Sequence, residues 1–138
     1  GDKLFGALDA KRMAASVAFT TDDGSYGEKG RVSDVLPEVI ARVRADVVYA
    51  CGPMAMLEAV QRVASEAYDG AGIPTQLSVE ESMACGIGVC MTCVLPIIGS
   101  DGQTRMARSC VDGPVFGGDR IRWDALGTVP DDAVGAHQ

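Results

Sequence analysis

The chain has 138 residues, 47% of them hydrophobic and 22% charged, which suits one soluble globular domain or a small domain with part of another. Its net charge of −7, with twelve scattered Lys and Arg residues, makes it a poor candidate for binding nucleic acid, because phosphate binding needs clustered basic residues. No apolar run approaches the ~20 residues that cross a bilayer, and the mixed start Gly1-Asp2-Lys3 does not resemble a signal peptide, so we expect a cytoplasmic protein without membrane contact.

The first 79 residues alternate between helical and strand patterns. Ser33 is a suitable N-cap for a helix, and Pro53 suits the first turn of another. The alternation predicts an α/β layer with a parallel sheet. Hydrophobic spacing predicts helices over residues 2–14, 33–43 and 53–70, and short apolar runs bounded by turns predict strands over 16–20, 46–50 and 75–79.

After the third predicted strand the helical periodicity stops, and glycines and cysteines become frequent. Residues 91–97 and 104–108 predict two strands, joined by a turn at 99–102. The polar, glycine-containing residues 125–138 predict a loose tail, in which we expect no chemical role for His137.

Four of the five cysteines follow the spacing Cys85-x4-Cys90-x2-Cys93-x16-Cys110. Structural disulfides are rare in the cytoplasm, so this group requires a metal or redox explanation. The spacing matches the plant-type [2Fe–2S] pattern, in which each iron takes two thiolates. The two glycines between the first two cysteines allow loop conformations that other residues resist, so that backbone N–H groups can face the sulfurs.

Other interpretations of these cysteines stay open. A cysteine is often a small buried hydrophobic residue, although four at this spacing make that explanation weak. A structural Zn²⁺ held by four thiolates is the stronger rival, although zinc sites usually pair two Cys-x2–4-Cys motifs, whereas Cys110 stands alone. A disulfide framework is disfavoured by the expected compartment.

Two segments carry a resemblance to a known family: residues 80–93 (EESMACGIGVCMTC) and 109–116 (SCVDGPVF). They closely resemble the iron–sulfur module of the electron-transfer subunit of bacterial NAD-dependent dihydroorotate dehydrogenase, in the ferredoxin–NAD(P)⁺ reductase superfamily. Residues 21–30 resemble the segment after the third strand of that superfamily's nucleotide domain. The same superfamily has a motif on the nicotinamide side of its nucleotide site. The residues of this chain that resemble it, and are therefore its cofactor-binding candidates, are Cys51, Gly52, Pro53 and Met56.

The resemblance implies a fold in three parts. Residues 1–79 would be a partial Rossmann-like, NAD-binding half of a ferredoxin reductase-like domain, residues 80–124 a small β-rich [2Fe–2S] cluster domain, and residues 125–138 a tail. Because the family's FAD-binding barrel and its Gly-rich opening turn are not found, the chain resembles a C-terminal portion, and we expect no FAD binding on this chain alone. Two exposed edges of the sheet would need a missing N-terminal FAD-binding domain, another chain or a rearranged sheet to cover them.

The resemblance also implies an electron relay. It runs from NADH through FAD and a [2Fe–2S] cluster to the FMN of a partner catalytic subunit of dihydroorotate dehydrogenase, in pyrimidine biosynthesis. The metal ligands would be Cys85, Cys90, Cys93 and Cys110, and no residue of the chain is expected to be catalytic by itself. Two alternatives stay open: the same module in a hydrogenase-type or transhydrogenase-type complex, or a zinc-stabilised structural domain.

For several single residues, a structural role is an alternative to the functional role. Cys51 would lie near the nicotinamide ring, or would be a plain buried thiol at a strand end. Asp22 and Asp23 would contact a nucleotide, or would form a solvated turn, which is the commoner role for such a pair. Trp123 suits core packing better than a partner contact.

Overall fold

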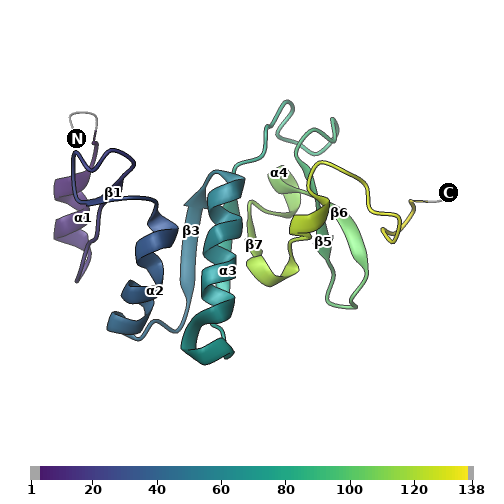
Figure 1. Ribbon diagram of the computed structural model, residues 1–138. Coiled ribbons are helices and arrows are strands. Elements are labelled where there is room, and N and C mark those ends of the chain that lie inside the picture. Colours follow the sequence, from purple (N-terminus) through teal and green to yellow (C-terminus); the bar gives the residue numbers. More distant parts are fainter. Residues whose placement is uncertain (1–3, 137–138) are drawn as a thin grey trace.

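The computed structural model describes residues 4–136 and shows a mixed α/β chain (Figure 1). Among these residues, no helix is both long enough and apolar enough to span a membrane. The helices are α1 (Ala7–Met13), α2 (Val32–Val43), α3 (Met54–Gly70) and α4 (Ser109–Asp112). The strands are β1 (Thr20–Thr21), β2 (Glu28–Lys29), β3 (Val48–Gly52), β4 (Thr75–Val79), β5 (Val94–Ile98), β6 (Thr104–Arg108) and β7 (Val115–Gly117). Two 3-10 turns, Gly118–Arg120 and Trp123–Ala125, follow β7.

The strands form three small sheets. β1 and β2 make a short parallel pair, β5 and β6 make an antiparallel hairpin, and the middle sheet has the order β3-β4-β7. β3 and β4 run parallel and are connected through α3, as the alternating pattern predicts. β7 adds to the other edge of β4 in the antiparallel direction, with Phe116 opposite Leu77. The middle sheet therefore contains strands from both sides of the cysteine-rich segment.

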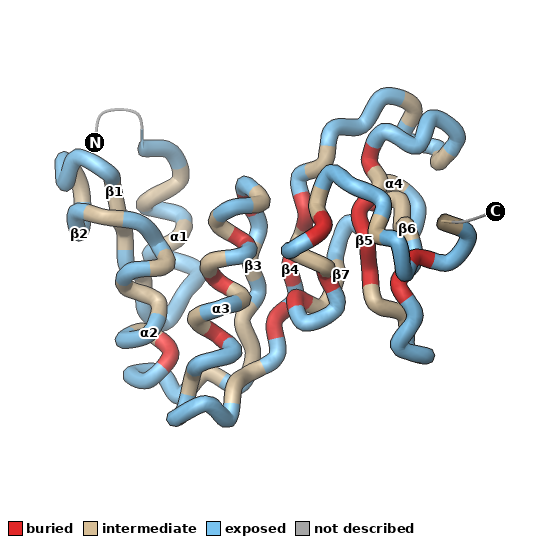
Figure 2. The backbone as a smooth tube through the Cα atoms, turned by 45° about the vertical axis from the view of Figure 1, so that its right-hand side comes forward, coloured by how far each residue is buried: buried red, intermediate tan, exposed pale blue. Residues whose placement is uncertain are grey.

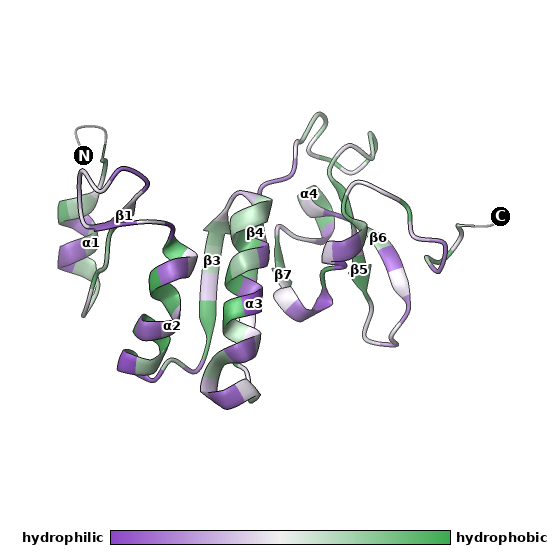
Figure 3. Cartoon of the chain, in the orientation of Figure 1, coloured by the Kyte–Doolittle hydropathy of each residue, from purple (hydrophilic) through white to green (hydrophobic). Residues whose placement is uncertain are grey.

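One hydrophobic core joins the two parts of the chain. Leu57 and Val60 of α3 pack with Leu77 and Val79 of β4, and Leu95 of β5 extends the same cluster. Figure 2 shows the buried residues concentrated along α3, β4 and β5. β5 is hydrophobic along its length, whereas its partner β6 carries hydrophilic residues (Figure 3). Because β4 and β5 flank the cysteine-rich segment, this core holds both ends of that segment.

Several predicted elements have the expected bounds, and others are shifted. Residues 75–79 and 104–108 form β4 and β6 as predicted. α2 begins at Val32, so Ser33 lies within its first turn and is not the predicted N-cap. The carboxylate of Asp34 accepts a hydrogen bond from the N–H of Arg31 (2.8 Å), and this contact closes the start of the helix.

Two predicted strands begin later in the chain than expected. In the segment 16–20 only Thr20 lies in a strand, where β1 pairs with β2, and among residues 4–136 no strand lies beside the outer edge of β3. The segment 91–97 enters a strand only at Val94, because Met91 has a positive φ of 57° that directs the chain into a turn.

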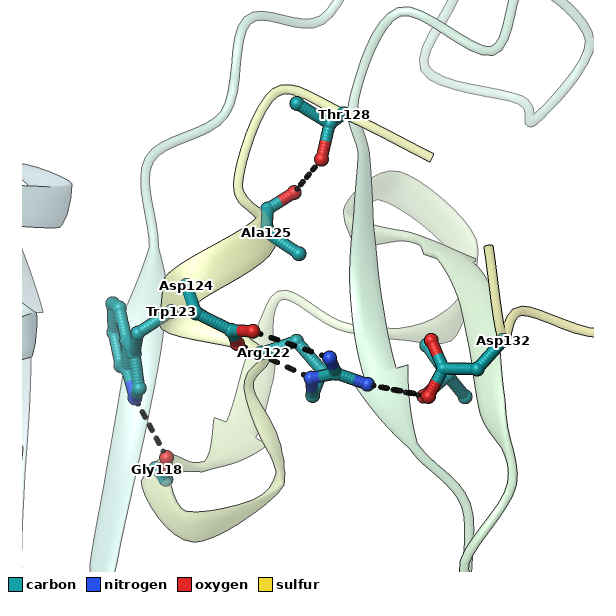
Figure 4. Close-up of polar contacts among 8 residues, drawn as sticks. Gly118, Arg122, Trp123, Asp124, Ala125, Thr128 and Asp132 are labelled. Carbon is teal, nitrogen blue, oxygen red and sulfur yellow. Dashed lines mark hydrogen bonds and ion pairs between the residues drawn. The ribbon is translucent and has the colours of Figure 1, made fainter. Parts of the chain in front are cut away.

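The tail packs against the hairpin instead of being loose over its described part. Arg122 donates hydrogen bonds to Asp124, to the hydroxyl of Thr104 (2.8 Å) and to the carboxylate of Asp132 (2.9 Å), and Figure 4 shows Arg122 between the two carboxylates. The N–H of Val134 donates to the carbonyl oxygen of Thr104 (2.9 Å). Composition does not show such long-range contacts. His137 lies outside the described residues.

Candidate metal centre

The cysteine-rich loop between β4 and β5 projects beyond the ends of the strands (Figure 1). The pairing of β5 with β6 places Val94 opposite Arg108, so that Cys93 and Cys110 lie just beyond the same end of the hairpin. The N–H and the hydroxyl of Ser109 both donate to the carbonyl oxygen of Cys93, at 3.0 and 3.1 Å. These bonds fix the two cysteines beside each other.

The four thiols lie in two interacting pairs. Cys93 and Cys110 form one pair, and Cys85 and Cys90 form the other. Cys93 is buried, Cys85 and Cys110 are partly buried, and Cys90 is exposed. The cysteines thus form a partly exposed site, with Cys93 on its buried side and Cys90 on its solvent-facing side.

Backbone and side-chain donors point at these sulfurs. The N–H of Ile87 donates to the sulfur of Cys85 at 3.5 Å. Hydrogen bonds from the hydroxyl and the N–H of Thr92, and then the contact with Cys85, lower the pKa of Cys90 to about 6. The N–H of Cys110 and then its thiol lower the pKa of Cys93. Such donors stabilise sulfur that carries negative charge.

The pKa of Cys110 moves in the opposite direction. Its hydrogen bond to the sulfur of Cys93 raises this pKa first, burial raises it further, and repulsion between the two neighbouring thiolates adds to the rise. The N–H of Gly88 donates to Cys110 and opposes this rise. A bound metal would remove the conflict, because its positive charge stabilises both thiolates.

Gly88 is the point at which the loop crosses the turn that carries Cys110. Its φ is +82°, and a Cβ at this position would lie 2.8 Å from Cγ2 of Val111 and 3.2 Å from Nη1 of Arg108. A side chain here would therefore displace the loop. Gly86 also has a positive φ, of 67°, although a Cβ there would meet no other atom within 4 Å. Of these two loop glycines, Gly88 is therefore the one at which the packing itself requires glycine.

The donor set fits a two-iron cluster. Such a cluster takes four thiolates, two on each iron, and shields part of its surface with protein. In the described part of the chain, the four thiols do not gather into one group of three or more metal-binding side chains, and they lie instead as two pairs.

The predicted nicotinamide-side residues lie at the carboxyl end of β3 and the start of α3. Pro53 and Met56 line an open groove of about 890 Å³, which also takes in Thr21 and Arg31. Gly52 packs under Met56, since a Cβ on Gly52 would lie 2.7 Å from Cε of Met56. Cys51 is exposed rather than buried, and its sulfur lies 3.9 Å from a carboxylate oxygen of Glu80.

Asp22 and Asp23 both line the same groove. Asp23 accepts a hydrogen bond from the N–H of Ser25 (2.9 Å), and the hydroxyl and N–H of Ser25 lower its pKa to about 2. This carboxylate therefore stabilises its own turn, as acidic turn residues commonly do. Trp123 packs against the hydrophobic core and donates to the carbonyl oxygen of Gly118 (2.9 Å), in keeping with its expected packing role.

Exposed apolar residues lie within or next to the two chain segments that carry the paired cysteines. These are large hydrophobic residues that are more than half exposed, and they come from the loop and from α4. They are Met83, Ile87, Val89, Met91 and Val111, and we refer to them as the apolar rim.

The sequence alone did not single out the residues that support the sulfurs. Thr92 lies between two ligand candidates, Ser109 precedes a third, and Arg108 donates to the carbonyl oxygen of Gly88 at 3.2 Å. Their positions within or next to the two cysteine segments are the only sequence signal that could have indicated them.

Comparison with known proteins places the cysteine-rich part in a known domain family. Residues 80–122 match the family model of the iron–sulfur cluster binding domain of dihydroorotate dehydrogenase B. The matched range contains all four paired cysteines, the hairpin of β5 and β6, and β7.

Curated relatives extend the similarity along most of the chain. The electron transfer subunit of dihydroorotate dehydrogenase B (NAD(+)) from Caldanaerobacter subterraneus subsp. tengcongensis is 39% identical over an alignment of 128 positions, and the match covers 86% of this chain and 49% of that protein. The probable subunit of this kind from Methanopyrus kandleri is 37% identical over 134 residues, 97% of this chain and 47% of that protein. The chain thus spans about half the length of these relatives.

A solved structure supports the same relationship. A chain from the structure of NADH-dependent reduced ferredoxin-NADP oxidoreductase, studied for flavin-based electron bifurcation, is 32% identical and superposes with a TM-score of 0.60. The match covers 78% of this chain and 35% of that one. Residues 80–122 therefore match the iron–sulfur cluster binding domain of dihydroorotate dehydrogenase B, and the chain as a whole is similar to about half the length of that enzyme's electron transfer subunits.

Proposed function

We propose that this chain is an electron-transfer module whose [2Fe–2S] cluster is held by Cys85, Cys90, Cys93 and Cys110. The observation that carries the proposal is the arrangement of these four thiols in two interacting pairs, with backbone N–H groups directed at the sulfurs. Cys85 and Cys90 would hold one iron, and Cys93 and Cys110 the other.

When bound, such a cluster supplies one-electron transfer, which lets a two-electron hydride carrier serve one-electron steps. The chain's own residues hold and tune it. Thr92 and the N–H groups of Ile87 and Gly88 stabilise charge on the sulfurs, and the packing of Cys93 limits access of water from the inner side.

The module would work within a larger relay in the cytoplasm. Electrons would enter from NADH and FAD and leave to the FMN of a dihydroorotate dehydrogenase catalytic subunit, in pyrimidine biosynthesis. The apolar rim is the surface best suited to such a partner, because its residues lie within or next to the segments that carry the paired cysteines and are exposed in this chain. The free outer edge of β3 would accept a further strand, from an N-terminal FAD-binding domain or from another chain.

We further infer three structural parts along the chain. Residues 1–79 would be half of a Rossmann-like nucleotide domain, supported by the parallel pair β3–β4 and the connecting helix α3. Residues 80–124 would be the cluster domain, and residues 125–138 an appended tail. The shared core and the pairing of β7 with β4 would keep these parts rigid relative to each other.

The first test is the metal content of anaerobically purified protein. We expect about two irons and two acid-labile sulfides per chain, with the visible absorption of a [2Fe–2S] cluster. Zinc without sulfide would contradict the proposal and leave a zinc-stabilised structural domain.

The groove lined by Pro53 and Met56 is the proposed nucleotide site. It lies at the start of α2 and α3, where backbone N–H groups favour phosphate. We expect Met56→Trp, which fills the groove, to weaken NADH binding to the full-length protein at least about tenfold, or roughly 1.4 kcal/mol. Isothermal titration measures this, with Val129→Trp on the exposed surface as the control. Equal affinity in the two variants would exclude the groove.

A second candidate function follows from the solved structure. Its name describes an NADH-dependent reduced ferredoxin-NADP oxidoreductase, so the same module could serve a transhydrogenase-type complex. Copurification separates the candidates. An FMN-containing catalytic subunit that oxidises dihydroorotate supports the first, and a flavoprotein that reduces NADP⁺ supports the second.

A further inference from the structure

Arg108 connects the two chain segments that carry the paired cysteines. Its side chain extends from the end of β6, and Nη1 donates to the carbonyl oxygen of Gly88 in the loop at 3.2 Å. Gly88 in turn directs its N–H at the sulfur of Cys110. One residue of the loop is thus held on both sides, by the arginine at its carbonyl and by the cysteine at its N–H.

The same arginine also closes the short helix that carries Cys110. The carboxylate of Asp112 accepts from the backbone N–H of Arg108 at 2.8 Å and from Nε at 3.3 Å. The carboxylate therefore fixes the guanidinium, while the guanidinium reaches across to Gly88. The planar guanidinium makes these two side-chain contacts from two different nitrogens, Nε and Nη1, whereas a lysine would have only one nitrogen to place between the two acceptors.

We propose that Arg108 is a positioning residue for the iron–sulfur cluster, one that holds the N–H of Gly88 on the Cys110 sulfur and keeps a positive charge beside the cluster. The proposal rests on the cluster proposed above. Hydrogen bonds to the sulfurs and nearby charge both favour the reduced, more negative state, so Arg108 raises the reduction potential and slows loss of iron.

The matched control is Arg105, on the same strand. Arg105 forms an ion pair with Asp101, four residues away, at 2.6 Å, and Arg108 forms one with Asp112, also four residues away, at 3.3 Å. The two arginines have similarly exposed side chains, 48% and 37%. Arg105 lies toward the turn of the hairpin, whereas Arg108 lies at the end beside Cys93 and Cys110. An exposed ion pair by itself contributes little, so the comparison isolates the contact with Gly88.

The test measures reduction potential by EPR-monitored titration, and iron release to a chelator, in Arg108→Met, Arg108→Lys and Arg105→Met. We expect Arg108→Met to lower the potential, to alter the EPR g-values and to release iron at least about tenfold faster, the scale of outer-shell substitutions at metal sites. Arg108→Lys keeps the charge and should restore part of the potential, but it should still release iron faster. Arg105→Met should behave as the unchanged protein does.

Gly88→Ala is a second variant that displaces the same N–H from the other side, because its Cβ would meet Val111. It should change the EPR signal and speed iron release in the same direction. Unchanged potential, EPR signal and iron release in Arg108→Met would overturn the inference, as would equal changes in Arg105→Met. Absence of iron and sulfide from the unsubstituted protein would instead contradict the proposed function, so the two failures are distinguishable.

Discussion

Cys110→Ser is expected to reduce iron and sulfide from about two per chain to well below one, with loss of most visible absorption from the cluster. A serine hydroxyl is a hard oxygen donor that replaces a soft thiolate, which is the ligand type that iron–sulfur clusters select. Cys93 would then lack its partner on the same iron. Iron and sulfide analysis beside the visible spectrum measures the effect.

The fold itself should survive this change. Cys110 lies in the short helix α4 and is only partly buried, and the hydrophobic core is built by other elements. Far-UV circular dichroism should therefore be unchanged. Cys51→Ser is the control, because Cys51 contacts Glu80 and should leave the metal content at its original level. A normal cluster spectrum in Cys110→Ser would mean that the fourth ligand is another residue.

Leu77→Ala should lower the free energy of unfolding by about 2–5 kcal/mol, the range for removing a fully buried leucine. Leu77 has no exposed surface, and it lies in β4 between Ala50 of β3 and Phe116 of β7. The truncation leaves a cavity where the two parts of the chain share one core. Chemical denaturation followed by circular dichroism gives the change.

The control for this prediction is Leu8→Ala in α1. Leu8 is 70% exposed, so its truncation should change the free energy of unfolding by less than about 0.5 kcal/mol. The same variants report on the metal centre, because β4 leads directly into the cysteine loop. Leu77→Ala should lose its cluster at a lower temperature than the unsubstituted protein does. Equal stability of the two variants would show that this shared core does not hold the fold together.

The candidate ligands were predictable from the sequence because their chemistry is local. Three of the four thiols lie within nine residues, Cys85 to Cys93, so their spacing in the sequence limits how far apart they can lie. The bounds of β4 and β6 were predictable for a similar reason, since alternating or continuous apolar runs and a glycine turn act over a few residues. The resemblance of residues 80–93 and 109–116 to a known family is confirmed by the family model over 80–122.

Contacts between distant parts of the chain depended on the tertiary structure. The strand predicted over 16–20 is wrong because a short apolar run becomes a strand only where a neighbour offers hydrogen bonds, and most of this one has no such neighbour in the described chain. The tail was predicted to be loose, yet Arg122 and Thr104 hold Asp132 and Val134. Polar composition describes a segment but does not show which partners it meets.

The features of the candidate metal centre likewise fall into those that the sequence predicted and those that only the structure shows. The cysteine spacing by itself predicted Cys85, Cys90, Cys93 and Cys110 as iron ligands, enclosed by a glycine-containing loop, and this ligation stays a prediction. The structure decided that Cys110 reaches Cys93, because the pairing of β5 with β6 brings together residues that are 17 positions apart. It also decided that Arg108 holds Gly88 across 20 positions. Such contacts arise from strand pairing and shared burial, which are properties of the folded chain and leave no periodic signal in the sequence.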